Sequence, residues 1–416
     1  MKTVIIGTGP AGMTTAETIR RHDPGAELLL LTTEHRPPYS PPAMADHFLT
    51  GRREPLFWKG TDVAERIGAT ELRGVHVSDV TPAAHELTLS DGRRLSYGTL
   101  VLASGSRLHA PLPGNDLAGI HDFKSLDAAE RIVTRLRTGD VSSVIIVGCG
   151  FIGVELALLL SDLGASVTVL GRRGWVMPRM LDPQTAAIAE QAIRERGVDL
   201  RLGVAASAFV GAETVEGVEL ADGTILTADA YVAATGVKPH VEYLDGSGIG
   251  MDWGVHVDDR LRTDAPDIYA AGDVAEAADR MTGERYVHAI FPNAVAQGEV
   301  VARNIVGIDT AYAGAESMNS LKHLGIPIVS IGAMAGDDVL RWQDGQAMRT
   351  VWLTAGRIVG CRLAGEIAGA GFYRALMLRG DDVRHFGRRR VDPSFGPGAV
   401  ALPTVLPGMS GRPRVA

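Results

Sequence analysis

A glycine-rich turn close to the N-terminus constrains the fold of this chain more than any other feature. The apolar run Thr3–Ile6 reads as a buried parallel strand and leads directly into Gly7, Gly9 and Gly12, a Gly-x-Gly-x-x-Gly pattern. Residues 13–21 are predicted to form a helix. The glycines allow a tight turn, close approach of backbone to a pyrophosphate, and helix–strand packing. Phosphates would lie at the helix N-terminus, where N–H groups and the helix dipole favour anions. The pattern predicts a dinucleotide-binding loop; a purely structural strand–turn–helix is the alternative.

The same pattern occurs a second time in the chain. Residues 143–155 read SVIIVGCGFIGVE, with glycines at positions 148, 150 and 153. Each glycine pattern is followed by a segment of equal length, residues 91–105 and 222–236, with a turn and then a buried strand ending in small residues. Two motifs repeated in the same order indicate duplication of a whole dinucleotide-binding unit.

The two copies differ after their second strand. In the first copy, strand 27–31 is followed by Glu34, an acid suited to bind the hydroxyls of an adenosine ribose, or else a solvated loop acid. In the second copy, strand 165–170 is followed by Arg172 and Arg173. Arginines make bidentate contacts to phosphate, so this copy favours NADPH over NADH. Two exposed loop arginines are the alternative.

Composition restricts the classes of function. A chain of 416 residues is long enough for two or three domains, and its net charge of −8 argues against nucleic-acid binding. No stretch is long and apolar enough to span a membrane, and the chain enters a strand at once, which leaves no room for a signal peptide. We therefore expect a cytoplasmic protein. Cys149 and Cys361 have no metal-ligand or CxxC spacing, so no metal site is expected.

Later segments add further candidates. The proline-rich stretch 36–43 is a rigid segment that could wall a flat cofactor or form a stiff surface loop. A predicted strand ends at Gly272 and Asp273, and the Asp273 carboxylate could accept a hydrogen bond from a ligand hydroxyl there. A helix is predicted from Phe291 to Ile305. From residue 318 the pattern changes to alternating strands, which suggests a third, antiparallel unit.

Together these motifs resemble the flavoproteins with two dinucleotide-binding domains, the pyridine nucleotide–disulfide oxidoreductase superfamily. The motifs are GTGPAG, the paired ASG and ATG segments, GCGFIGVE, TDAPDIYAAGD and PNAVAQGEVVARNI. The chain is most similar to rubredoxin and ferredoxin reductases and to the flavin domain of nitrite reductases. The resemblance implies an α/β fold with two Rossmann-like domains and a C-terminal α+β interface domain. The implied parts are an FAD-binding domain (1–112 and 239–317), an NAD(P)H-binding domain (113–238), the α+β domain (318–392) and a disordered tail (393–416).

The resemblance also implies roles for single residues. Phe151 would be an aromatic gate that covers the flavin until nicotinamide displaces it, and Glu155 would orient the nicotinamide; core packing and a helix-surface acid are the respective alternatives. Asp273 would bind the ribityl chain of FAD, and the helix at Ala294 would face the flavin. The dinucleotide-contacting residues are Gly7, Gly9, Pro10, Ala11, Gly12, Glu34, Ala103, Ser104, Gly105, Arg107, Gly148, Gly150, Ile152, Gly153, Arg172, Arg173, Thr235, Gly236, Gly272, Asp273, Pro292, Asn293 and Ala294.

The implied activity is transfer of hydride from NAD(P)H to FAD and then of electrons to a redox protein of the iron–sulfur, ferredoxin or rubredoxin type. Two departures bear on the acceptor. The chain has no cysteine before Cys149, so a dithiol relay is not expected, and Pro41 stands where related sequences commonly have arginine. The alternatives are a cysteine-independent NAD(P)H oxidase and a non-catalytic FAD-binding subunit of a larger complex. A homodimer is among the expected assemblies, and neither nucleic acid nor a membrane is an expected partner.

Overall fold

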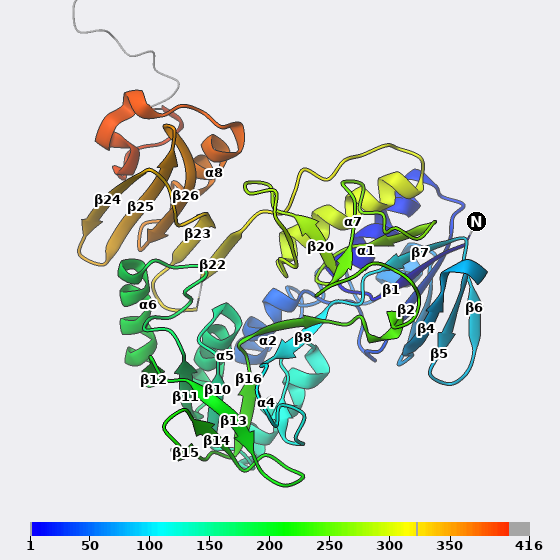
Figure 1. Cartoon of the computed structure of the whole chain (residues 1–416), viewed down its shortest axis with the longest axis horizontal. Coiled ribbons are helices and arrows are strands. Elements are labelled where there is room, and N and C mark those ends of the chain that lie inside the picture. The colour runs from blue at the N-terminus through cyan, green and yellow to red at the C-terminus, as the bar shows by residue number, and fades with distance from the viewer. Residues whose placement is uncertain (1, 322, 399–416) are drawn as a thin grey trace, which may run out of the picture. The chain divides into compact units, whose positions relative to one another are not determined.

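The computed structural model describes residues 2–321 and 323–398 and divides into two compact units, Met1–Ile326 and Pro327–Ala416. The first unit contains two parallel five-stranded sheets (Figure 1). Their inner strands Lys2–Ile6, Glu27–Thr32 and Ser143–Val147 are mostly apolar and buried, as expected for parallel sheets covered on both faces. In the described part of the chain, no helix has the length and apolar character needed to cross a membrane.

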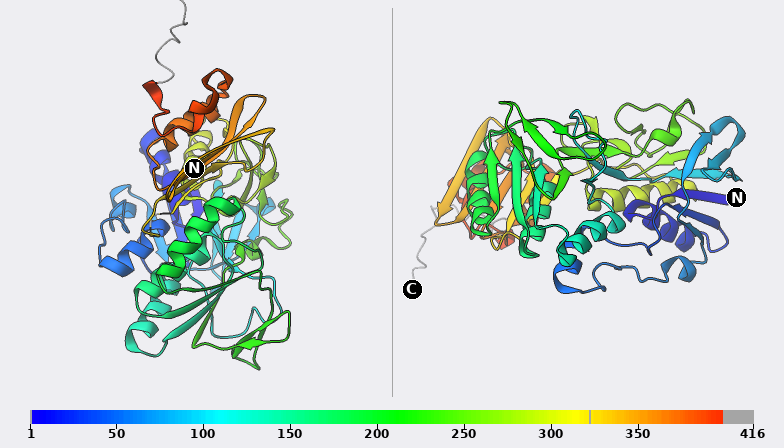
Figure 2. Two further views of the ribbon diagram at one scale, coloured as in Figure 1. Left: turned by 90° about the vertical axis from the view of Figure 1, so that its left-hand side faces the viewer. Right: turned by 90° about the horizontal axis from the view of Figure 1, so that it is seen from below.

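The first sheet is built around strand β1. Its order is β19-β7-β1-β2-β3, and every neighbouring pair is parallel. Helices α1 and α7 lie side by side (Figures 1 and 2). They meet at Gly298, where an added Cβ would lie 2.4 Å from the carbonyl oxygen of Ala11. The elements are β1 (Lys2–Ile6), β2 (Glu27–Thr32), β3 (Thr70–Arg73), β7 (Thr99–Leu102), β19 (Ile268–Ala270), α1 (Pro10–His22), α2 (Met44–Thr50), α3 (Val63–Arg66) and α7 (Phe291–Ile305).

The second sheet repeats the arrangement of the first. Its order is β12-β11-β10-β16-β9, with β10 in the central place that β1 occupies. This common order confirms the two Rossmann-like units of the expected α/β fold. The elements are β9 (Ile120–His121), β10 (Ser143–Val147), β11 (Ser166–Gly171), β12 (Asp199–Leu202), β16 (Ala230–Ala233), α4 (Leu126–Thr138), α5 (Phe151–Asp162) and α6 (Pro183–Glu195).

Short antiparallel sheets complete the first unit. Each parallel sheet is accompanied by a three-stranded one, β4-β5-β6 or β13-β14-β15. A third small sheet has the order β18-β20-β21. The strands of these three sheets are β4 (Val77–Thr81), β5 (Glu86–Leu89), β6 (Arg94–Ser96), β13 (Ala206–Val210), β14 (Gly217–Leu220), β15 (Ile225–Leu226), β18 (Val255–His256), β20 (Ala275–Ala278) and β21 (Arg285–Tyr286). Outside them lie β22 (Met318–Leu321) and the 3₁₀ helices Pro41–Ala43, Pro82–Ala84 and Glu242–Leu244.

The chain passes between the two parallel sheets through a pair of antiparallel strands. Strand β8 (Ser106–His109) follows the first-sheet strand β7, and its partner β17 (Gly236–Pro239) follows the second-sheet strand β16. The first sheet then gains its last strand, β19, from the returning chain. This strand order supports a discontinuous first domain, and the finer division of the chain into FAD- and NAD(P)H-binding parts stays a proposal.

The second unit is an antiparallel sheet with a helix. Its strands β23 (Ile328–Gly332), β26 (Arg357–Ala364), β25 (Ala347–Thr354) and β24 (Asp338–Asp344) are neighbours in that order, followed by α8 (Ala370–Arg379) and the 3₁₀ segment Arg384–Val391. This agrees with the expected C-terminal α+β part, although the units divide after residue 326 rather than 317.

The segment expected to be a disordered tail begins inside the second unit. Phe395 is 2 % exposed and contacts the rings of Phe372, Tyr373 and Phe386. The first residues after 392 therefore contribute to the core, because aromatic contacts outweigh the flexibility of the Pro/Gly-rich composition. Residues 399–416, the rest of the predicted tail, lie outside the described residues.

Candidate functional site

The first glycine loop has the backbone that a dinucleotide requires. Gly7 has a φ of 108°, and a Cβ there would lie 2.0 Å from the carbonyl oxygen of Ala103. A Cβ at Gly12 would lie 2.0 Å from the carbonyl oxygen of Gly7. At Gly9, by contrast, nothing lies within 4 Å of an added Cβ. Two glycines therefore close the turn, and the third leaves open space over the start of α1.

The start of α1 is suited to hold an anion. Pro10 occupies the first turn, where its missing N–H costs nothing, so the helix begins three residues before the predicted Met13. No side chain caps this end, and Ala11 and Gly12 are buried behind it. Uncapped N–H groups at a helix N-terminus favour phosphate, so the loop fits a pyrophosphate.

The second loop repeats the first contact for contact. Gly148 has a φ of 124°, and its Cβ would lie 2.2 Å from the carbonyl oxygen of Ala234. A Cβ at Gly153 would lie 2.1 Å from the carbonyl oxygen of Gly148, while Gly150 again faces open space. The neighbouring Ile152 is half-buried in the first turn of α5. The duplication read from sequence is therefore also a duplication of three-dimensional contacts.

Glu34 is a partly buried acid, one oxygen of which has no donor. Tyr39 donates its hydroxyl hydrogen to Oε1 of Glu34 at 2.8 Å and accepts from the N–H of Leu126 at 2.9 Å. Oε2 of Glu34 is buried, and no described group donates to it. Burial raises the pKa of Glu34 to about 7, although the Tyr39 hydrogen bond opposes this shift. A ribose hydroxyl would supply the missing donor, so Glu34 fits its predicted role.

Asp273 is held by two groups in the structure. Burial raises its pKa, but Lys124 and Ser106 outweigh that effect, and the net shift is downward. Nζ of Lys124 lies 2.7 Å from Oδ2 of Asp273, and the Ser106 hydroxyl donates to the same oxygen at 2.8 Å. Before it, the N–H of Gly272 donates to Gln297 at 2.7 Å. The carboxylate is therefore ionised and oriented; sequence reasoning missed Lys124, which no motif marks.

Other predicted contacts have protein partners. Arg107, expected near the FAD phosphates, pairs with Glu242 and approaches Nδ1 of His240 at 3.1 Å. The amide of Asn293 exchanges two hydrogen bonds with the backbone of Glu316, which fixes the start of α7 beside Pro292 and Ala294.

The small-residue segments after β7 and β16 are fixed in similar ways. Ser104 lies between Ala103 and Gly105 in the chain, and its hydroxyl donates to the carbonyl oxygen of His240 at 2.8 Å. The Thr235 hydroxyl donates to the carbonyl oxygen of His109 at 3.0 Å, and Gly236 begins β17. Both segments therefore lie where β8 and β17 begin.

The proposed catalytic pair begins helix α5. Phe151 is the first residue of α5 and Glu155 lies one turn later; both are half-buried. Nε2 of His323 lies 4.0 Å from Oε2 of Glu155 and 3.8 Å from Oδ1 of Asp46 on α2. The structure therefore brings a histidine and a second acid to Glu155, two residues that sequence reasoning did not connect.

Arg172 and Arg173 follow β11 and are both exposed. The carbonyl oxygen of Arg173 accepts from the N–H of Gly203, so the backbone of this loop is anchored while the side chains face solvent. They occupy the position after the second strand that Glu34 occupies in the first copy.

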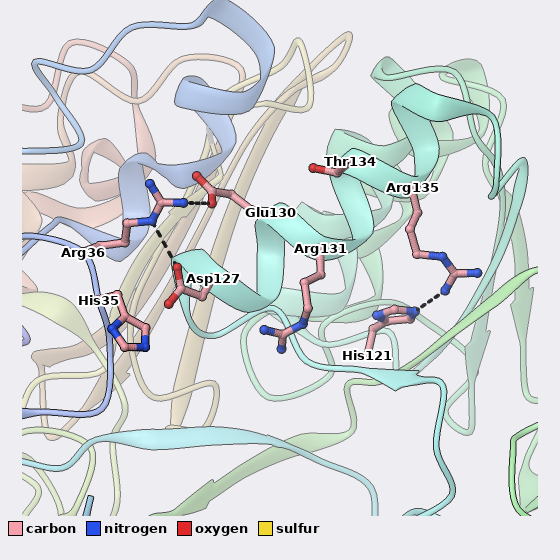
Figure 3. A pocket seen from close by; sticks show the side chains of 8 residues that line it. All are labelled: His35, Arg36, His121, Asp127, Glu130, Arg131, Thr134 and Arg135. Carbon is pink, nitrogen blue, oxygen red and sulfur yellow. Dashed lines mark hydrogen bonds and ion pairs between the residues drawn. The ribbon is translucent and has the colours of Figure 1, made fainter. Parts of the chain in front are cut away.

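A pocket of about 850 Å³ opens beside Glu34, between the segment after β2 and helix α4 (Figure 3). Arg36 binds Asp127 and Glu130 across it, and Arg135 approaches His121 at 3.1 Å. Both acids that line the pocket are paired with Arg36, the first residue of the proline-rich stretch 36–43, and none of the predicted dinucleotide-contacting residues lines it, so we assign no chemistry to it. The lining residues are His35, Arg36, His121, Asp127, Glu130, Arg131, Thr134 and Arg135.

Comparison with known proteins gives the same picture. Residues 1–298 match the model of the pyridine nucleotide-disulphide oxidoreductase family. NADH-dependent phenylglyoxylate dehydrogenase subunit epsilon of Aromatoleum evansii is 30% identical over 402 residues, which cover 92% of each chain. NADH oxidase of Methanocaldococcus jannaschii is 30% identical over 321 residues, or 75% of this chain and 71% of the relative. The ferredoxin reductase for the CYP199A2 system of Rhodopseudomonas palustris superimposes with a TM-score of 0.82 and 26% identity, covering 92% of this chain and 95% of that one. The chain therefore belongs to the pyridine nucleotide-disulphide oxidoreductase family, as the resemblance in its sequence predicted.

Proposed function

We propose that this protein is an FAD-dependent NAD(P)H oxidoreductase that passes electrons to a small redox protein of the iron–sulfur type. The observation that carries this function is the pair of glycine loops. The two loops make the same contacts, but different residues follow the second strand of each copy. Glu34, a partly buried acid, follows the first loop and its strand, and two exposed arginines follow the second. One loop is thus suited to a nucleotide held permanently and the other to one that exchanges with solvent.

The residues of the first copy would hold FAD, whose ring accepts hydride and releases electrons when bound. The α1 N-terminus would bind the pyrophosphate, and Glu34 would accept from the adenosine ribose. Asp273, oriented by Lys124 and Ser106, would accept from a ribityl hydroxyl. In the second copy, the start of α5 would bind the phosphates of NAD(P)H, and Glu155 would orient its nicotinamide. Phe151 would cover the flavin until the nicotinamide displaces it.

A thiol relay is not part of this function. The chain has two cysteines, and both are buried and unpaired. Burial raises the pKa of Cys149 and also raises the pKa of Cys361, to about 12. Thiols held protonated in this way are poor nucleophiles. Neither cysteine is therefore suited to relay electrons between bound FAD and the acceptor, and FAD would supply them to the acceptor directly.

The exposed arginines after β11 support a preference for NADPH. An Arg172→Glu variant is expected to lower the ratio of kcat/KM for NADPH to that for NADH by about tenfold, because a carboxylate repels a 2′-phosphate. Steady-state kinetics with both coenzymes measure this ratio. Arg94→Glu, a charge reversal at another exposed arginine, serves as the control. An Arg172→Glu variant with an unchanged ratio would remove the argument for NADPH.

Anaerobic stopped-flow reduction by NADPH or NADH tests the function itself. The reduced enzyme is then mixed with each of a panel of acceptor proteins. We expect rapid bleaching of the flavin and then fast re-oxidation by a [2Fe–2S] or rubredoxin-type protein. The M. jannaschii relative is named an NADH oxidase, and re-oxidation by oxygen that carriers do not accelerate would support that second function. The A. evansii relative is named a subunit, and flavin that neither coenzyme reduces would support a non-catalytic role.

A further inference from the structure

The small sheet β18-β20-β21 brings together three side chains that no dinucleotide motif contains. His256 on β18 and Glu276 on β20 are direct neighbours in a parallel register, so their side chains lie on the same face of the sheet. Asp252 lies four residues before His256, in a turn closed by bridge pairing of Met251 with Val255. Three separate backbone positions thus direct one imidazole and two carboxylates to one point.

Glu276 is held in place before any ligand arrives. The residue is 8 % exposed, and its Oε1 accepts from the N–H groups of Trp253 at 2.9 Å and Gly254 at 2.7 Å. The turn approaches so closely that a Cβ at Gly254 would lie 2.6 Å from the carbonyl oxygen of Val274. Backbone donors of this kind orient a metal-binding carboxylate and leave its second oxygen to bind.

The distances within the cluster are those of a metal site. Nε2 of His256 lies 3.1 Å from Oδ2 of Asp252 and 3.7 Å from Oε2 of Glu276. All three ligand atoms lie within 4.8 Å of one another. Two ligands that each lie about 2.1 Å from a tetrahedral Zn²⁺ are separated by about 3.4 Å, and the two distances from His256 lie within a few tenths of an ångström of this value.

Charge also favours a divalent cation here. The ionised carboxylates of Asp252 and Glu276 are like charges in one cluster, and a divalent cation bound between them would offset their repulsion. An exposed His–Asp ion pair adds little stability, since such pairs contribute about 0–1 kcal/mol. One nitrogen and two carboxylate oxygens are a donor set that zinc and neighbouring divalent metals accept.

We propose that Asp252, His256 and Glu276 bind one divalent metal ion of the zinc type, at a site separate from both glycine loops. The side chains of Asp252 and His256 are 84 % and 45 % exposed, so the ion exchanges with solvent and water completes its coordination. The ion would clamp the turn before β18 to β20. Since β20 begins two residues after Asp273, this clamp would stabilise the strand that follows the proposed ribityl contact.

Calorimetric titration of the untagged, FAD-loaded, chelator-treated full chain with ZnCl₂ tests the site. We expect saturable binding of one Zn²⁺ per chain and an increase in the thermal midpoint with added Zn²⁺, because a ligand that binds only the folded state stabilises it. A His256→Asn variant should bind at least about tenfold more weakly and lose the thermal shift. His22→Asn changes an exposed histidine elsewhere and should behave as the wild type.

An Asp252→Asn variant guards against a misfolded His256→Asn protein, because Asp252 is mostly exposed and its loss should weaken Zn²⁺ binding without unfolding. Two results would overturn the proposal. One is non-saturable Zn²⁺ uptake by the wild type, and the other is wild-type affinity in the folded His256→Asn and Asp252→Asn proteins.

Discussion

A Gly9→Val variant is expected to fold normally and to be purified colourless, without FAD. Gly9 has a φ of −71° and a ψ of −174°, which any L-residue adopts, and no atom lies within 4 Å of an added Cβ. The new side chain would instead fill the space where the pyrophosphate meets the start of α1. We expect FAD affinity to fall at least about 100-fold, or about 2.7 kcal/mol, while the free energy of unfolding of the FAD-free protein changes by about 1 kcal/mol. Absorbance near the flavin band and titration with FAD measure the first quantity, and denaturation measures the second.

Gly150→Val is the matched variant in the second loop. Gly150 has a φ of −73° and a ψ of −176°, and it faces the same open space. This variant should remain yellow, whereas half-maximal flavin reduction should require at least about tenfold more NAD(P)H. Gly371→Val, at another unstrained and open glycine, should change neither quantity. If Gly9→Val bound FAD like the wild type, the pyrophosphate could not lie at this loop.

Replacing Glu34 by glutamine should remove a pH dependence from the stability of the FAD-free protein. The pKa of Glu34 is raised from 4.5 to about 7, so the folded state binds this proton more tightly than the unfolded state. The resulting penalty is absent below pH 4.5, grows between the two pKa values and is complete above about pH 7. At full extent it amounts to about 3 kcal/mol. The wild type should therefore lose this much stability relative to Glu34→Gln as the pH rises through that range.

Chemical denaturation of both FAD-free proteins at several pH values between 4.5 and 8 measures the difference. Glu65→Gln, at an exposed acid, should give a difference that does not vary with pH. A ribose hydroxyl donates to the ionised acid, so wild-type affinity for FAD should also rise with pH, and that of Glu34→Gln should not. A pH-independent difference between wild type and Glu34→Gln would mean that this carboxylate is ionised in the empty site.

Local patterns in the sequence were sufficient for the glycine loops and most elements of the parallel sheets. The contacts of Gly7 with Ala103 and of Gly148 with Ala234 involve residues from paired motifs, so the duplicated sequence already indicated them. Boundaries were less accurate: α1 begins at Pro10 and not at Met13, because proline is well accommodated in the first turn of a helix.

Partners distant in sequence were the part that could not be predicted. Lys124 reaches Asp273 across 149 positions of the chain, and Arg107 reaches Glu242 across 135. Neither pair leaves a periodic or spacing signal, because each depends on how separate strands are placed. The raised pKa of Glu34 was equally hidden, since it results from burial rather than from residue type.

The two-stranded connection of β8 and β17 has a consequence for how the protein is made. As the chain leaves the ribosome, all the strands of the second sheet emerge before β19, which the first sheet needs at its edge. Until residue 268 is synthesised, one edge of β7 has no partner strand. Its exposed backbone N–H and C=O groups can then pair with the wrong strand or promote aggregation. The inserted second sheet can therefore fold first, whereas the first sheet has to wait for β19, although its strand β1 is synthesised earlier.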